Sequence, residues 1–93
     1  FGHLAEKENS LAAYALALYD ELLQKFGNET DIIIKVEVAS TTNCKGLALY
    51  YLKRKEDAIK AYDACIQKFG NETDIVIKAK VAQAMSYKSI VLQ

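Results

Sequence analysis

The sequence contains no proline and only four glycines, two cysteines and one histidine. So few turn-forming residues exclude an all-β fold of many short strands, because such folds need glycine and proline at their turns. Lysine and arginine balance aspartate and glutamate at twelve each, so the positive charge expected of a general nucleic-acid binder is absent. No apolar run approaches the roughly 18 residues that a membrane span requires, and no signal-peptide pattern opens the chain.

The composition that is present indicates a small globular domain. Of 93 residues, 52% are apolar and 26% are charged, which excludes disorder by composition. The two cysteines, Cys44 and Cys65, lack the spacing of metal ligands, and we expect them to be small buried apolar residues. Two unpaired thiols favour a reducing, cytoplasmic setting, although a disulfide between them stays an open alternative.

The strongest signal is a duplication within the chain. Residues 19–39 align without a gap with residues 62–82, 43 positions further on, and 15 of the 21 pairs are identical. Both copies contain the run Gln-Lys-Phe-Gly-Asn-Glu-Thr-Asp. A period near 40 is typical of stacked helical hairpins or of propeller blades, and the scarcity of glycine argues against blades.

Each copy is predicted to form two helices separated by a short turn. Apolar residues at helical spacing predict helices over residues 9–26, 31–53, 57–69 and 74–92. We expect Asn9 or Ser10 to cap the first of these, with residues 1–4 forming the tail of a preceding helix.

Glycine and threonine mark the turn between the two helices of each copy. We expect Gly27 and Gly70 to adopt the left-handed conformation that commonly ends a helix. Thr30 and Thr73 are then predicted to be the N-caps of the helices that follow, and the aspartate after each threonine favours a helix start.

Residues 32–38 and 75–81 also allow a strand, because β-branched residues alternate there with charged ones. A pair of strands is therefore the structural alternative at these segments. A helix is favoured because the same residues satisfy helical spacing and no breaker follows before Arg54. In the second copy, Ala79 and Lys80 replace valine and glutamate and give that segment good helix formers.

These features resemble the tetratricopeptide repeat (TPR), in a long-helix variant whose period is near 43 instead of 34. Gly46 and Ala58 stand where the family keeps small residues, Tyr62 at its aromatic position and Cys65 at the next small one. The family's proline after the second helix is replaced by a Gly-Asn pair in both copies. The resemblance implies an all-α fold of antiparallel helical hairpins stacked as an α–α superhelix, a TPR-like solenoid. It makes residues 1–93 one domain and a piece of a longer array.

The resemblance also implies a binding surface, since the first helix of each TPR, helix A, lines a groove that holds a peptide or protein. Carried over position by position, six residues of this chain would face that groove: Asn43, Leu47, Tyr50, Tyr51, Ser86 and Ile90. Tyrosine and asparagine supply contact area and adaptable hydrogen bonds at such surfaces. Packing of Leu47 and of one tyrosine between repeats is an equally open interpretation. A basic pair that clamps a ligand carboxylate in chaperone-binding relatives is not matched, because Asn43 and Leu47 occupy its places.

The predicted function is therefore protein–protein interaction without enzymatic activity. The alternative is a structural segment that forms a homo-oligomer through exposed terminal helices, since residues 90–92 are apolar and no predicted helix follows them. We expect no cofactor, no metal and no membrane or nucleic-acid partner. His3 lies next to the terminus without an evident catalytic partner, and the Asn-Glu-Thr sequons are explained by helix capping.

Overall fold

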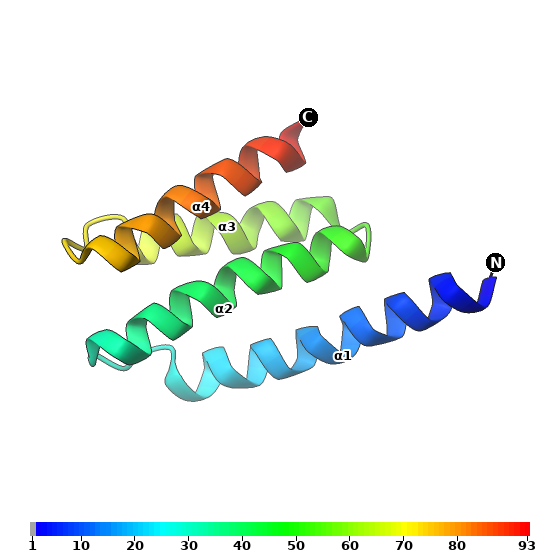
Figure 1. Cartoon of the computed structure of the whole chain (residues 1–93), viewed down its shortest axis with the longest axis horizontal. Helices are drawn as coiled ribbons and strands as arrows, with labels where there is room; N and C mark the ends of the chain where they lie inside the picture. Colours follow the sequence, from blue (N-terminus) through cyan, green and yellow to red (C-terminus); the bar gives the residue numbers. More distant parts are fainter. Residues whose placement is uncertain (1) are drawn as a thin grey trace.

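The computed structural model describes residues 2–93, with side chains from residue 9 onward, so the side chain of His3 lies outside the described part. Residues 2–93 form four helices and no strand: α1 (Gly2–Phe26), α2 (Ile32–Tyr51), α3 (Lys55–Phe69) and α4 (Ile75–Leu92). The prediction of an all-α fold is confirmed (Figure 1). The strand alternative for residues 32–38 and 75–81 is wrong, because both segments are helical.

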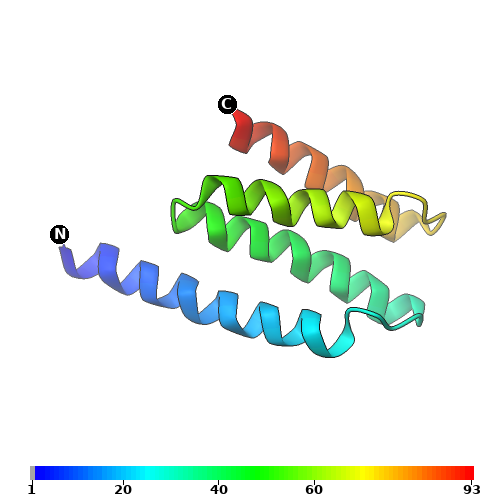
Figure 2. The ribbon, with the colours of Figure 1, turned by 180° about the vertical axis from the view of Figure 1, so that it is seen from behind.

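Helix α2 lies at the centre of the arrangement and packs against all three of the other helices. Helix α3 packs against both α2 and α4, whereas α1 contacts α2 alone (Figures 1 and 2). The molecule measures 46 × 30 × 17 Å, so its smallest dimension is close to two helix diameters. In so thin a molecule, each outer helix keeps one face against solvent.

The two helices that follow the duplicated turn begin at an aspartate. The Asp31 carboxylate accepts hydrogen bonds from the backbone N–H groups of Ile33 (2.9 Å) and Ile34 (3.3 Å). Asp74 caps α4 in the same way. Thr30 and Thr73 were expected to be these N-caps. In both copies the N-cap is instead the aspartate that follows the threonine. A charged cap satisfies the free N–H groups and complements the helix dipole, which offsets the weak helix propensity of the isoleucines that follow.

Neither turn glycine takes the left-handed conformation that the sequence predicted, since no glycine of the described residues has a positive φ. Gly70 has φ −60° and ψ −25°, which is right-handed helical backbone. Glycine is needed at Gly27 and Gly70 for a different reason: a Cβ would press against the carbonyl oxygen of Leu23 or Ile66. The left-handed residue is Lys53, with φ 61°, in the turn between α2 and α3.

Three helix boundaries lie two or more residues from those expected. Helix α2 ends at Tyr51 instead of residue 53. Helix α1 runs unbroken from Gly2, so Asn9 and Ser10 lie within it and no separate helical tail precedes it. Good helix formers on both sides of these two residues favour continuation over a cap. Helix α3 begins at Lys55, where Arg54 donates to the Asp57 carboxylate at 2.8 and 3.0 Å and holds the first turn.

The core lies where α2, α3 and α4 meet and combines small residues with larger ones. Its most deeply buried members include Ala39, Ala58, Cys65, Ile77 and Ala84. Small side chains let helix axes approach closely, and larger residues such as Tyr62 and Phe69 fill the remaining space. Gly46 fulfils the role expected of it, because a Cβ there would lie only 2.5–2.9 Å from ring atoms of Tyr62.

The duplication is visible in the contacts as well as in the sequence. Lys45 of α2 pairs with Asp20 of α1 at 2.7 Å, and Lys88 of α4 pairs with Asp63 of α3 at 2.6 Å. The two pairs lie 43 positions apart in the sequence. The hairpins α1–α2 and α3–α4 therefore repeat one set of contacts.

Replacing Gly46 by alanine tests the close approach of α2 to α3. In a helix that packed loosely here, alanine would raise the free energy of unfolding by about 1 kcal/mol through its better helix propensity. We expect a decrease of about 1–2 kcal/mol instead, because the Tyr62 ring is buried and must shift. Urea denaturation measures the difference. Ser89→Ala at the matching exposed position of α4 is the control and should change stability by less than about 0.5 kcal/mol. A stabilising G46A would contradict this packing.

Candidate functional site

Three of the six residues expected in the groove line one surface hollow. Tyr50 and Tyr51 come from the end of α2, and Ile90 comes from the last turns of α4. The hollow has a volume of about 560 Å³, and the other residues that line it are Lys53, Lys55, Val91 and Gln93. The structure therefore brings the ends of α2 and α4 and the α2–α3 turn to one place.

The turn after α2 fixes how the two tyrosines are presented. The backbone N–H of Leu52 bonds to Ala48 O, and the N–H of Arg54 bonds back to Leu49 O at 2.9 Å. With Lys53 in the left-handed conformation, the chain reverses within three residues and closes the helix end. Tyr50 and Tyr51 thus stand exposed on a rigid helix end, which costs less conformational entropy on binding than a loop would.

Leu47 and Ile90 occupy equivalent positions of the two copies, and both are exposed. Leu47 lies one helical turn before Tyr51, and Cys44 lies a further turn before Leu47. The thiol of Cys44, which is exposed and free, therefore shares one stripe of α2 with both residues. An apolar row on α2 thus leads toward the hollow, and its thiol can report on anything that covers it.

Asn43 is buried, which differs from the groove position that the resemblance implied for it. Only 3% of the residue is exposed, and its amide donates to the backbone oxygen of Lys80 at 3.0 Å. Asn43 is therefore a tether between α2 and α4 and is not available to a partner. Its helical spacing to Ala39 and Gly46, both core positions, is the signal in the sequence that pointed inward. Ser86, the equivalent residue of α4, is exposed but does not line the hollow.

Sequence reasoning missed the contribution of α1. Tyr51 also lines a second hollow, of about 350 Å³, together with Asn9, Leu11 and Ala12 of α1. This segment was expected to begin a helix, and none of its residues was among the six expected in the groove. Because α1 is continuous, it reaches the end of α2 and flanks Tyr51. The side chain of Tyr51 therefore lies between two hollows and can contact a ligand in either.

The first hollow combines aromatic and apolar surface with positive charge. Lys53 and Lys55 are the two charged residues that line it, and both are exposed. Among residues 9–93, no aspartate or glutamate side chain lines the hollow to neutralise them. Tyrosine rings offer broad contact area, and flexible ammonium groups attract an acidic side chain. The arrangement suits a peptide segment with an apolar anchor and a neighbouring acidic residue.

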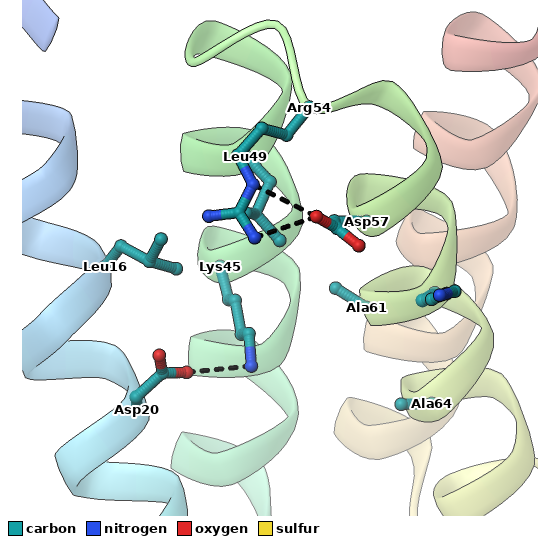
Figure 3. Close-up of a pocket in the computed structure, with 9 residues that line it drawn as sticks. Leu16, Asp20, Lys45, Leu49, Arg54, Asp57, Ala61 and Ala64 are labelled. Carbon is teal, nitrogen blue, oxygen red and sulfur yellow. Dashed lines mark hydrogen bonds and ion pairs between the residues drawn. The ribbon is translucent and has the colours of Figure 1, made fainter.

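A third hollow lies between α1, α2 and α3 (Figure 3). Four of the five charged residues that line it form ion pairs with one another, whereas Lys60 takes part in no ion pair within residues 9–93. Lys45 reaches Asp20 of α1 at 2.7 Å, and Arg54 reaches Asp57 at 2.8 Å. The close-up shows Lys45 of α2 extending toward Asp20 of α1, and Arg54 extending toward Asp57 of α3. Charges that neutralise each other within the fold are poor candidates for acid–base work on a substrate.

Two buried groups have strongly raised pKa values. Burial raises the pKa of the Cys65 thiol to about 11. Burial also raises the pKa of Tyr62 to about 12, with smaller contributions from Tyr87, whose ring centroid is 5.7 Å away, and from Cys44. Both groups are therefore protonated at neutral pH and cannot act as nucleophiles. Among residues 9–93, no three histidine, cysteine or acidic side chains cluster as metal ligands would.

The two cysteines should differ sharply in reactivity. Cys44 is exposed, whereas Cys65 is fully buried with a raised thiol pKa, and the thiolate is the form that reacts. We expect iodoacetamide at pH 8 to label Cys44 alone in the folded protein and both residues in denaturant. Mass spectrometry of the digested chain assigns the label. Equal rates at the two positions, or a disulfide between them, would contradict the packing of Cys65.

Stability should fall as the pH rises above 9. The Cys65 thiol loses its proton near pH 9 in the unfolded chain but only near pH 11 in the folded one, so unfolding releases a proton between these values. The free energy of unfolding should drop by roughly 1 kcal/mol for this group between pH 8 and pH 10. Denaturation of Cys65→Ala over the same range is the control, and its decline should be shallower. An equal slope in both proteins would refute the assignment.

No helix of residues 2–93 combines the length and the hydropathy that crossing a membrane requires. Comparisons of the chain with protein-family models, with curated proteins and with solved structures found no match. The exposed aromatic end of α2, beside α4 and two lysines, is the feature that a proposed function must explain.

Proposed function

We propose that this chain is a non-enzymatic interaction module, built as a TPR-like solenoid, that binds a peptide or protein partner along α2 and α4. The hollow where Tyr50, Tyr51 and Ile90 meet is the observation that carries the proposal. In TPR terms α2 and α4 are the A helices, and the hollow lies at one end of the groove between them.

Three features support the assignment to a TPR-like arrangement. The ion pairs of Lys45 and Lys88 recur at the repeat spacing, and so do the aspartate caps. Gly46 lies directly beneath the ring of Tyr62, as expected for a small residue facing an aromatic one. The arrangement of α2 between α1 and α3 is that of a helix shared by neighbouring hairpins.

The surface of the hollow indicates the chemistry of the partner. Exposed tyrosines and an isoleucine favour an apolar or aromatic anchor residue, because such residues dominate the energy of small interfaces. Lys53 and Lys55 favour an acidic residue next to that anchor. The two unpaired cysteines support a reducing, cytoplasmic setting, and we include that location in the proposal.

Selection from a random peptide display library, followed by affinity measurement, tests the proposal. Peptides that bind the chain should lose at least about tenfold in affinity to Tyr51→Ala and to Ile90→Ala, because interface anchors contribute about 2 kcal/mol or more. Tyr14→Ala is the matched control, since Tyr14 and Tyr51 are both 67% exposed and lie on different helices. Affinity should be unchanged in this control.

The thiol of Cys44 supplies an independent readout in the same experiment. A peptide lying along the stripe of Leu47 and Tyr51 should slow alkylation of Cys44 several-fold. Failure to select any peptide, or selection of peptides that depend on Tyr14 and ignore Tyr51, would overturn the proposed groove.

A further inference from the structure

Helix α1 exposes two of the positions that its counterpart α3 buries. Leu18 is 48% exposed, whereas Ala61, 43 positions later, is 6% exposed beneath α2. Phe26 is 40% exposed, whereas its counterpart Phe69 is 2% exposed. Leu11 and Tyr14 extend the same side of α1 at helical spacing, and both are exposed. The face of α1 equivalent to the α2-facing side of α3 is thus apolar and uncovered.

Helix α4 exposes the positions that its counterpart α2 buries. Met85 is 57% exposed, whereas the equivalent Thr42 is 8% exposed. Further along the same face, Ser89 and Leu92 are exposed, and their counterparts in α2, Gly46 and Leu49, are buried. No helix of residues 2–93 covers this side of α4. The two ends of the molecule therefore carry the two halves of the α2–α3 contact.

Two polar contacts join the hairpins α1–α2 and α3–α4. The counterparts of the residues that make them lie at the two ends of the molecule. Lys35 of α2 pairs with Glu72 at 2.7 Å, and Lys68 donates to the backbone oxygen of Gly27. The counterparts of the first pair are Lys78 on α4 and Glu29 in the α1–α2 turn. Within residues 9–93, neither of them takes part in an ion pair. The counterparts of the second contact are Lys25 and the backbone oxygen of Gly70.

We propose that a second copy of this chain docks head to tail, with its α1 on the α4 of the first copy, as α3 packs on α2. The same operation brings Glu29 of one copy to Lys78 of the other, and Lys25 of one copy to the Gly70 carbonyl of the other. The contact is heterologous, because different surfaces of the two copies meet, and it leaves one free end of each kind. Repetition of the contact therefore gives an open series of copies.

The sizes of the residues are consistent across the proposed contact. Ser89 is the counterpart of Gly46, and Tyr19 is the counterpart of Tyr62. In the proposed contact the ring of Tyr19 therefore faces Ser89. Because serine has a side chain and glycine has none, this ring must lie further from the helix than the Tyr62 ring does from Gly46. Helix α1 provides that distance, because Leu18 and Leu22 replace the smaller Ala61 and Cys65 of α3. Helices carrying larger residues pack with larger axial separation. Met85 then fills the extra space on the α4 side.

A second copy is favoured over an unrelated partner because both halves of the surface are already present in one chain. The exposed face of α1 and the exposed face of α4 are complementary in both apolar residues and charges. One alignment, set by the 43-residue spacing, brings both kinds of residue together. Repeat arrays normally end in polar capping faces, whereas the described faces of α1 and α4 expose apolar residues such as Leu18 and Met85. The contact uses neither Tyr51 nor Ile90, the two residues whose substitution tests the proposed peptide groove.

Sedimentation equilibrium of the 93-residue chain from about 10 µM to about 1 mM tests the proposal, since weak interfaces dissociate in this range. The average mass should rise with concentration beyond that of two copies. Leu18→Glu alters the head and Met85→Glu alters the tail, and both residues are exposed, so each variant should fold. Alone, each variant should associate at least about tenfold more weakly than the unaltered chain.

Mixing the two variants gives the decisive result. Leu18→Glu retains an intact tail and Met85→Glu an intact head, so the mixture should form a complex of one copy of each and grow no further. Tyr51→Ala, altered in the groove only, should associate as the unaltered chain does. This control separates a failure of the head-to-tail contact from a failure of the peptide groove.

Charge reversal provides a second arm of the same measurement. Lys78→Glu and Glu29→Lys should each weaken association by about threefold, which is the scale of an exposed ion pair. The variant that carries both substitutions should associate as strongly as the unaltered chain, because the ion pair forms again with its charges exchanged. A single-copy mass at about 1 mM would overturn the proposal. So would growth that stops at two unaltered copies, which indicates a symmetric interface, or a mixture of the two glutamate variants that stays unassociated.

Discussion

The contact between the Tyr62 ring and the backbone of Gly46 is the constraint on which the rest of the packing depends. It sets the distance between α2 and α3, because a side chain at Gly46 would overlap the ring. At that distance, alanines and Cys65 fit between the helices, and larger residues such as Tyr62, Phe69 and Ile77 fill the rest of the core. Close packing of this kind leaves little room to adjust, so the helices keep one relative position and carry the surface residues with them.

Repetition of one contact set explains both the stability of the centre and the exposure at the ends. In a repeat array each unit is stabilised mainly by its neighbours, so a helix with neighbours on both sides is the best buried. Helix α2 has that position, and its residues Ala39, Asn43 and Gly46 are buried. Helices α1 and α4 have the same kinds of faces with a neighbour on one side only. Their exposed leucines and Met85 thus follow from the repeat.

The sequence was sufficient for the four helices and the repeat, because helical spacing and a near-identical 21-residue segment are local signals. It placed the caps one residue early, since threonine and aspartate both cap helices and only the backbone geometry decides between them. It assigned Asn43 to the groove by position in a family pattern, although the residue faces α4. The family position was given more weight than the local signal, since the helical spacing of Asn43 to the core positions Ala39 and Gly46 already indicated an inward-facing residue.

The groove and the two ends are apolar for different physical reasons, and the difference supports separate roles. The ends carry aliphatic residues and lone charges in the register of an internal contact, which is what a repeated helix interface requires. The hollow beside Tyr50 and Tyr51 differs from the ends in its chemistry, because its aromatic residues end a helix beside two lysines. This difference is the reason to propose recognition of an apolar and acidic segment at the hollow and contact between copies at the ends. Because α2 contributes to both the core and this hollow, the packing at Gly46 also fixes the geometry that a ligand meets.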